Sequence, residues 1–244
     1  MRRRIKQLLG PAYFAARRWF SRIFIERRLG IETATEVGLR DLGLHTDDRV
    51  DYEPSGWRDL RRILALDEVV QGDVFIDFGS GKGRVLLEAA RYPFKRVIGV
   101  EISAELNRTA AANIQRVREA GTSGSTIELV TADAVDYEIP DDVTIAYFYN
   151  PFRGRAFHTV IERLLESVDR CPRFVRVIYR TPLEEDYLAA TGRLRLVKTS
   201  RGRRPGRHWQ HTSSLRMYVA LPSGVDGRFT SRERPSPRGP GHAA

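Results

Sequence analysis

Glycines recur at alternate positions directly after an apolar stretch, in the sequence FIDFGSGKGRVLLEAA of residues 75–90. Gly79, Gly81 and Gly83 permit a backbone turn with positive φ, which brings main-chain N–H groups close to a ligand at the start of a helix. Asp77 lies two residues before the first glycine and adds a carboxylate to the same turn. These residue types at this spacing predict a site that holds a small polar ligand against the backbone.

Two other kinds of glycine-rich turn do not fit these residues. A phosphate-binding loop requires a glycine, four residues and then Gly-Lys-Ser/Thr. Ile76 stands where its first glycine belongs, and Gly83 stands where the hydroxyl residue belongs. A dinucleotide-binding fingerprint requires a third glycine at the position of Arg84. The alternating glycines therefore indicate a different ligand.

Two further carboxylates follow apolar runs later in the chain. Glu101 ends the run RVIGVE of residues 96–101, and Asp133 follows the run TIELVTA of residues 126–132. If these runs are parallel strands of one sheet, their carboxyl ends lie at the same edge, where ligands bind in such sheets. We therefore expect Asp77, Glu101 and Asp133 to line a single pocket.

Strand-like and helix-like patterns alternate along most of the chain. Strands are expected at 73–78, 96–101, 126–132, 143–149, 173–179, 194–200 and 214–221. Helices are expected at 55–70, 83–91, 103–119 and 155–169, with a short helix after the fifth strand. This order predicts an α/β fold: a single Rossmann-like seven-strand sheet, mostly parallel with the last strand antiparallel, and helices on both faces.

Composition divides the chain into three segments. Residues 1–30 combine basic and bulky apolar positions at helical spacing, which predicts a basic amphipathic N-terminal helical segment. Residues 31–221 contain the predicted sheet and helices, and residues 222–244 have the composition of a disordered tail. Two interpretations of residues 1–30 stay open: a helix that lies on an anionic surface, and a helix that covers the protein's own sheet.

The formal net charge of +10 is concentrated in two segments. Residues 1–30 carry nine basic residues and one acid, and residues 193–207 carry seven basic residues and no acid. Such segments suit an anionic membrane surface or nucleic acid as a partner. Arginines interrupt the apolar positions of residues 1–30, so neither a membrane span nor a signal peptide is expected there.

The single cysteine, Cys171, excludes an internal disulfide and a zinc site built on several thiolates. The sequence HWQH of residues 208–211 offers two histidines without an evident third ligand, so we expect no metal. A cytoplasmic location, with peripheral association at a membrane surface as a variant, is the expectation that fits these features.

The run VFIDFGSGKG resembles the first motif of class I S-adenosylmethionine-dependent methyltransferases. The resemblance implies that residues 31–221 form a methyltransferase domain with S-adenosyl-L-methionine as its cofactor. It implies that Asp77 orients the methionine amino group, that Glu101 accepts hydrogen bonds from both ribose hydroxyls, and that Asp133 and its neighbour meet the adenine. The expected cofactor-binding residues are Asp77, Gly79, Ser80, Gly81, Gly83, Glu101, Ile102, Asp133 and Ala134.

The fourth expected strand ends in YFYNPF, residues 147–152, where the reacting group belongs. This run is similar to the N-P-P-[FY] motif of methyltransferases that act on adenine amino groups or glutamine amides, with one proline missing. The candidate catalytic residues are Tyr149, Asn150, Pro151 and Phe152. The Asn150 carboxamide is expected to grip a planar amine or amide while the two aromatic rings stack around it. A second interpretation, in which Asn150 caps the next helix, stays open.

The same glycine turn is also similar to that of non-SET histone-lysine methyltransferases and related lysine methyltransferases. That resemblance implies that the segment YEPSGW of residues 52–57 covers the cofactor and that Tyr147, Tyr149 and Phe152 line a channel for lysine. The combined prediction is methyl transfer by in-line displacement, to an amino group on a protein side chain, a nucleic acid base or a small molecule. The alternative is a non-catalytic module of the same fold that binds RNA or an anionic membrane through its basic segments.

Overall fold

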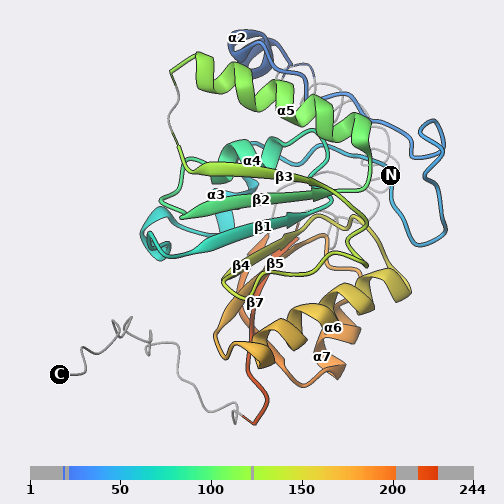
Figure 1. Ribbon diagram of the computed structural model, residues 1–244, viewed down its shortest axis with the longest axis vertical. Helices are drawn as coiled ribbons and strands as arrows, with labels where there is room; N and C mark the ends of the chain where they lie inside the picture. Colours follow the sequence, from blue (N-terminus) through green and yellow to red (C-terminus); the bar gives the residue numbers. More distant parts are fainter. Residues whose placement is uncertain (1–18, 20–21, 122–123, 202–213, 225–244) are drawn as a thin grey trace, which may run out of the picture.

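A computed structural model of the protein describes residue 19 and residues 22–121, 124–201 and 214–224. Seven strands form one sheet in the order β3-β2-β1-β4-β5-β7-β6 (Figure 1). β7 runs antiparallel to both of its neighbours, and the remaining pairs are parallel. The predicted α/β sheet with an antiparallel last strand is thereby confirmed. The strands are β1 (Val74–Phe78), β2 (Arg96–Glu101), β3 (Thr126–Thr131), β4 (Ile145–Phe148), β5 (Val175–Arg180), β6 (Leu194–Arg201) and β7 (Ser214–Ala220).

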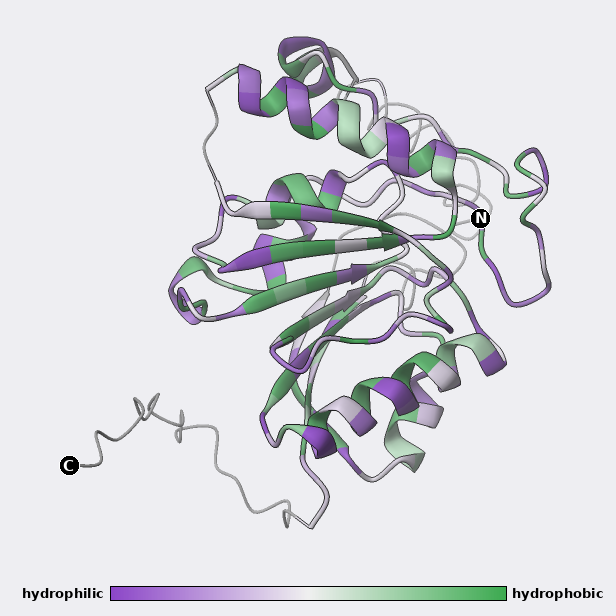
Figure 2. Ribbon diagram, viewed as in Figure 1, coloured by the Kyte–Doolittle hydropathy of each residue, from purple (hydrophilic) through white to green (hydrophobic). Residues whose placement is uncertain are grey.

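Helices cover both faces of the sheet (Figure 1). One face carries α3 (Asp59–Ile63), α4 (Arg84–Ala89) and α5 (Ala104–Glu119), and the other carries α6 (Gly154–Arg170) and α7 (Glu185–Ala190). Each face has its own apolar cluster of buried strand and helix side chains. Figure 2 shows the hydrophobic residues concentrated in the strands and on the helix sides that face them. The core thus holds the strand ends, and the residues that follow them, in fixed positions.

Sequence pattern and burial agree closely in α6. Its apolar residues recur at the three- and four-residue spacing of one helical face, and that face is buried against the sheet. The buried members are Phe157, Val160, Ile161, Leu164, Leu165 and Val168. β1, by contrast, is buried along its whole length, as expected for a central parallel strand covered on both sides.

The helix predicted over residues 55–70 is shorter than expected. α3 ends at Ile63, and a separate 3-10 turn, η2 (Leu66–Glu68), follows it. Ala65 has an extended backbone, and its N–H donates to the Glu68 side chain at 2.7 Å. This side-chain cap satisfies an N–H group that a continuous helix would have bonded to its own backbone, so the chain starts a new turn there.

Several predictions concern residues outside the described ranges. The basic N-terminal segment is described only at residue 19 and from residue 22 on, where η1 (Arg22–Glu26) and α2 (Arg27–Leu29) form helical turns. The HWQH run and residues 225–244 also lie outside the described residues. Within the described ranges, no helix has the length and apolar character needed to span a membrane. Among those same residues, no group of three or more His, Cys, Asp or Glu is arranged to hold a metal ion.

Candidate functional site

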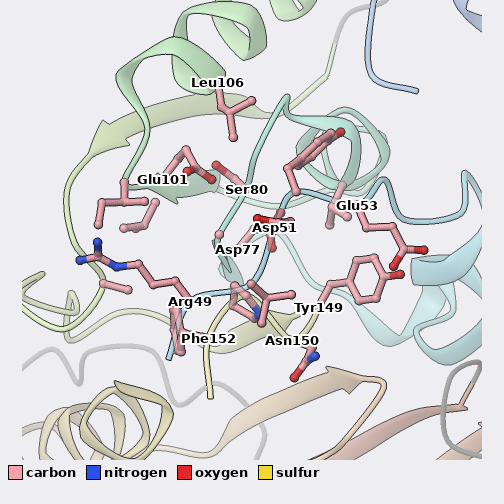
Figure 3. Close-up of a pocket in the computed structure, with 18 of the residues that line it drawn as sticks. Arg49, Asp51, Glu53, Asp77, Ser80, Glu101, Leu106, Tyr149, Asn150 and Phe152 are labelled. Atoms are coloured by element: carbon pink, nitrogen blue, oxygen red, sulfur yellow. The ribbon is translucent and has the colours of Figure 1, made fainter. Parts of the chain in front are cut away.

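A cavity of about 640 Å³ lies beyond the carboxyl ends of β1 and β4 (Figure 3). These two strands pair with each other, and the strand order reverses between them, because β2 and β3 extend the sheet on one side and β5 on the other. Parallel sheets bind ligands at this reversal point, and the volume is typical of a small-molecule site. The predicted residues that line the cavity are Asp77, Gly79, Ser80, Glu101, Ile102, Asp133, Ala134, Tyr149, Asn150, Pro151 and Phe152.

The glycine turn between β1 and α4 is closely packed from outside. A side-chain Cβ at Gly79 would overlap Pro151, and one at Gly81 would overlap the Tyr52 ring. Both glycines have positive φ, +75° and +54°, which other residues rarely adopt. The N–H groups of Gly79 and Ser80 donate to the Val100 carbonyl at 2.8 and 3.1 Å, which fixes the turn to β2. Gly81 and Gly83 therefore shape the turn without lining the cavity.

Asp77 is buried at the end of β1, with 3% of its surface exposed. Burial, with a smaller contribution from the Glu101 charge, raises its pKa well above the usual range. Among the residues that the structure describes, none donates a hydrogen bond to this carboxylate. A ligand that brings a cation or N–H donors would compensate the buried charge.

Glu101 is buried at the end of β2 and accepts two backbone hydrogen bonds. Its Oε2 accepts from the Gly81 N–H at 2.8 Å, and its Oε1 accepts from the Ser103 N–H at 2.9 Å. Burial raises the pKa of Glu101, and these hydrogen bonds oppose the rise. Each oxygen keeps a lone pair for a further donor, so the carboxylate can accept two hydroxyl groups from a ligand.

Asp133 forms an ion pair that the sequence did not suggest. Its Oδ2 lies 2.7 Å from the Arg49 guanidinium, and its Oδ1 accepts from the Val135 N–H at 3.1 Å. Figure 3 places Arg49 and Glu101 on one side of the pocket and Tyr149 on the other. The Arg49–Asp133 pair therefore closes the end of the cavity that β3 contributes.

Residues 48–53 form a covering segment that runs along the loop after β4. The Val50 N–H donates to the Pro151 carbonyl at 3.1 Å, and the Arg153 N–H donates to the Asp48 carbonyl at 2.7 Å. Neither contact has a local sequence signal, because each joins residues about a hundred positions apart. The segment YEPSGW was expected to cover the cofactor, and its Tyr52 packs on the glycine turn.

Two cations of the glycine run bind the chain on both sides of the covering segment. The buried Arg84 donates to the Glu26 carboxylate at 2.8 Å, to the Thr33 hydroxyl at 2.8 Å and to the Ser55 carbonyl at 2.7 Å. Lys82 reaches both oxygens of Glu32, at 2.9 and 2.8 Å. The charged residues between and after the glycines thus hold the N-terminal part of the domain over the turn.

The side of the pocket next to β4 and β5 contains buried polar groups without partners. The Asn150 Oδ1 and the Tyr147 hydroxyl are buried, and within the described residues neither has a hydrogen-bond partner. Asn150 has φ of 45°, a strained value for a residue other than glycine. Arg180 is fully buried; its Nε lies 2.9 Å from Asp59, and its guanidinium lies 3.6 Å from the Tyr149 ring centroid.

Phe152 lies in the pocket wall, and its ring also packs into the core. Its centroid is 6.3 Å from that of Phe148 and 6.4 Å from that of Phe157. The helix-cap interpretation of Asn150 is wrong, because Arg153 is the N-cap of α6. The first N–H of α6, from Gly154, instead donates to the Glu184 carboxylate at 3.0 Å. Asn150 thus has no capping role, and it lines the pocket with its Oδ1 buried.

Comparison with known proteins finds two sequence similarities. Residues 75–173 match the family described as "Methyltransferase domain". A "Protein-lysine N-methyltransferase" from Saccharolobus islandicus is 40% identical over 68 residues, which is 28% of this chain. The match spans 42% of that relative, so less than half of its length is shared.

Several solved structures are similar to this chain at low identity. A tRNA m1G37 methyltransferase from M. jannaschii has a TM-score of 0.49 at 12% identity, covering 70% of this chain and 51% of the other. A SAM-dependent methyltransferase from Methanosarcina mazei has a TM-score of 0.46 at 12% identity, covering 64% and 96%. A TehB-like SAM-dependent methyltransferase from Corynebacterium glutamicum has a TM-score of 0.45 at 15% identity, covering 69% and 89%.

Proposed function

We propose, from the premise that this chain carries a class I methyltransferase domain, that it transfers a methyl group from S-adenosylmethionine to an amino nitrogen. One observation carries the proposal: the glycine turn and two buried carboxylates, Asp77 and Glu101, meet in a single cavity at the reversal point of the sheet. Class I methyltransferases use S-adenosylmethionine, and this set of residues fits that cofactor.

The cavity walls carry polar groups that would bind the separate parts of this cofactor. Asp77 is a buried carboxylate that would hold an ammonium group, and Glu101 has two oxygens that would hold the ribose hydroxyls. Asp133 and Ala134 would border the adenine at the end closed by Arg49. Gly79 lines the cavity with its backbone, and its missing side chain lets Pro151 pack against the turn.

When bound, the cofactor supplies an activated methyl group. The lone pair of the acceptor nitrogen forms the new N–C bond as the C–S bond breaks, and the electron pair of the C–S bond stays on sulfur. The protein's own task is to position the acceptor and exclude water. Asn150 is suited to this role, since its unpartnered Oδ1 would accept an N–H of the acceptor amine. Tyr147 and Tyr149 form the adjoining wall.

A protein lysine is the acceptor that the sequence similarity favours, because the Saccharolobus islandicus relative is named as a protein-lysine N-methyltransferase. The shared 68 residues support this acceptor as a proposal for the present chain. A lysine ammonium must first lose its proton, which passes to solvent water, before the nitrogen lone pair can attack.

Calorimetric titration of S-adenosylmethionine, with NAD as the comparison ligand, tests the cofactor. We expect dissociation constants in about the micromolar range, or about −8 kcal/mol, for the first ligand and no binding of the second. Glu101→Gln is expected to weaken binding about 10- to 100-fold, because it removes charge-assisted hydrogen bonds. Glu105→Gln is the matched control, since Glu105 is an exposed acid in the first turn of α5.

Transfer of a labelled methyl group to protein and nucleic acid pools then tests the reaction. A folded protein that binds neither ligand would contradict the proposal and favour the non-catalytic module. In that module, binding of RNA or anionic vesicles would weaken steeply with salt. Part of its basic surface is already neutralised, because Arg193 pairs with Asp169 and Lys198 pairs with Glu68.

A further inference from the structure

Two exposed carboxylates on the covering segment line the same cavity. Asp51 and Glu53 are both exposed, and neither forms an ion pair with any other residue in the described ranges. Asp51 accepts a hydrogen bond from the Leu39 N–H at 2.8 Å. Between them, Tyr52 also lines the cavity and packs on the glycine turn. Figure 3 draws Asp51 and Glu53 among the residues that line this pocket, together with Asp77 and Tyr149.

Buried groups without partners lie at the same end of the pocket. Asn150 is only 7% exposed and lines the cavity, yet its Oδ1 accepts no hydrogen bond from the described residues. The Tyr147 hydroxyl, also in the cavity wall, is buried without a partner in that part of the chain. Such atoms cost about 1–3 kcal/mol each when left unsatisfied. A ligand with several N–H donors would satisfy them.

The aromatic side chains at the pocket do not present two open ring faces between which a planar acceptor could stack. One face of the Tyr149 ring is covered by the Arg180 guanidinium at 3.6 Å. The Phe152 ring packs with Phe148 and Phe157 in the core. A nucleobase or a planar amide therefore gains little stacking here, whereas a slender alkyl chain needs only the walls of the cavity.

The charges at the opening also disfavour nucleic acid. Of the pocket's basic residues, Arg49 is paired with Asp133 and Arg84 is buried against Glu26. Arg153, which is exposed, is the remaining base in the cavity wall. Asp51 and Glu53 would repel a phosphate backbone and attract an ammonium group.

Resting on the methyltransferase activity proposed above, we propose that Asp51 and Glu53 select the acceptor as a cationic alkylamine. The two carboxylates receive the ammonium at the opening, and the unpartnered Asn150 Oδ1 receives the nitrogen farther in. The same chemistry is offered by a lysine side chain in a protein and by a free alkylamine, so both are included in the test.

The test measures binding and transfer for four acceptors. These are an unstructured lysine-containing peptide, the same peptide with norleucine at each lysine, n-butylamine, and an adenine-containing oligonucleotide. Binding is measured by calorimetry with S-adenosylhomocysteine present, and transfer is measured with labelled S-adenosylmethionine. The variants are Asp51→Asn, Glu53→Gln and the double variant, with Asp47→Asn as control. Asp47 is exposed on the same stretch of chain and does not line the pocket.

We expect the lysine peptide to bind and accept the methyl group, and the norleucine peptide and the oligonucleotide to do neither. The double variant should weaken peptide binding about tenfold at low ionic strength, since each partly screened charge contributes a few-fold. The loss should vanish near 1 M salt, where the screening length is about 3 Å. Asp51→Asn keeps the oxygen that accepts from Leu39, so folding and S-adenosylhomocysteine affinity should not change. Equal use of n-butylamine would identify a free amine as the source.

The proposal is overturned if the double variant binds the peptide as tightly as Asp47→Asn does. It is equally overturned if the oligonucleotide or the norleucine peptide accepts the methyl group as well as the lysine peptide does. Failure to bind S-adenosylhomocysteine at all would instead overturn the proposed function. Tight binding of S-adenosylhomocysteine without binding of either amine would leave the cofactor site standing and refute Asp51 and Glu53 as acceptor-selecting residues.

Discussion

The two halves of the pocket are built in different ways. On the side of β1, β2 and β3, Asp77 and Glu101 lie at the ends of their strands, and hydrogen bonds between two neighbouring strands hold the backbone turn, as Gly79 and Glu101 show. On the side of β4 and β5, the polar groups are assembled from distant parts of the chain. Arg180 pairs with Asp59, and the loop after β4 is bordered by residues 48–53.

This difference has a functional consequence. Any chain with the same glycine turn presents the same binding groups in this first half, which suits a cofactor common to many enzymes. The second half leaves buried atoms such as the Asn150 Oδ1 without partners, which suits an acceptor particular to this protein. Among the described residues, unpartnered polar groups occur in both halves. The Asp77 carboxylate and the Ser80 Oγ lie on the side proposed for the cofactor, and the Asn150 Oδ1 and the Tyr147 hydroxyl lie on the side proposed for the acceptor.

The largest effect is expected from closing the glycine turn. In Gly81→Ala, the new methyl group overlaps the Tyr52 ring, and the residue must also hold φ of +54°. The turn must shift, and a misplacement of about 1 Å lowers activity roughly 100-fold in well-positioned sites. We expect methyl transfer to fall by about that factor and S-adenosylmethionine binding to be lost in calorimetry.

Gly43→Ala is the matched control for backbone strain. Gly43 has φ of +68°, and nothing lies within 4 Å of the position where its Cβ would be. This variant should lose about 1 kcal/mol of stability and keep its cofactor affinity. Equal affinity losses in both variants would show that strain, rather than close packing on the turn, explains the effect.

The contrast between the halves also explains how much the sequence could predict. The order of the strands, the glycine turn and the three acids were all predictable, because each depends on short-range spacing and on the rule that parallel strands end at one edge. Arg84 was recognised only as a residue that excludes dinucleotide binding. Its bonds to Glu26 and Thr33 join residues more than fifty positions apart, and no local pattern encodes such a contact.

The role of Arg180 could not be predicted either, because Arg180 is simply the next residue after the expected strand RFVRVIY. A charged residue placed directly after a central strand, at the edge where ligands bind, is the signal that would have singled it out. The covering segment was predicted in part through YEPSGW, whereas the acids Asp51 and Glu53 gained a role only once the segment was placed over the pocket. Long-range packing, rather than composition, decides these assignments.

A smaller effect is expected from removing the buried cation in the second half. Arg180→Met leaves the Asp59 carboxylate, which is also buried, without its closest arginine contact. Breaking a buried ion pair costs about 3 kcal/mol, because the remaining charge stays desolvated. We expect that loss in urea unfolding, together with slower methyl transfer and unchanged S-adenosylhomocysteine affinity, because Arg180 supports Tyr149 and does not line the cavity.

Arg176→Met is the control on the same strand. Arg176 lies 2.8 Å from Asp73, and 22% of its side chain is exposed, so solvent screens the pair and the loss should be about 1 kcal/mol. If Arg180→Met weakened cofactor binding as much as it slowed transfer, the two halves of the pocket would not be separable in function.

A further effect is a pH dependence of stability that originates in the core behind the pocket, where α4 packs on β1 and β2. Glu88 is buried in α4, where burial raises its pKa to about 8, and it accepts a hydrogen bond from the Arg61 N–H. Between about pH 4.5 and pH 8 the folded chain keeps a proton on Glu88 that the unfolded chain has lost. Stability from this group is therefore complete below about pH 4.5 and falls as the pH rises through 8, by up to about 1.4 kcal/mol per pH unit.

Glu88→Gln should remove this slope, because the amide does not titrate and its oxygen can still accept from the Arg61 N–H. The measurement is urea unfolding at several pH values between about 5 and 8. Asp77→Asn is the comparison, since burial also raises the pKa of Asp77 and gives a slope of the same sign. If the slope survives Glu88→Gln and disappears in Asp77→Asn, the titrating acid is Asp77 in the pocket, and the assignment of the slope to Glu88 is refuted.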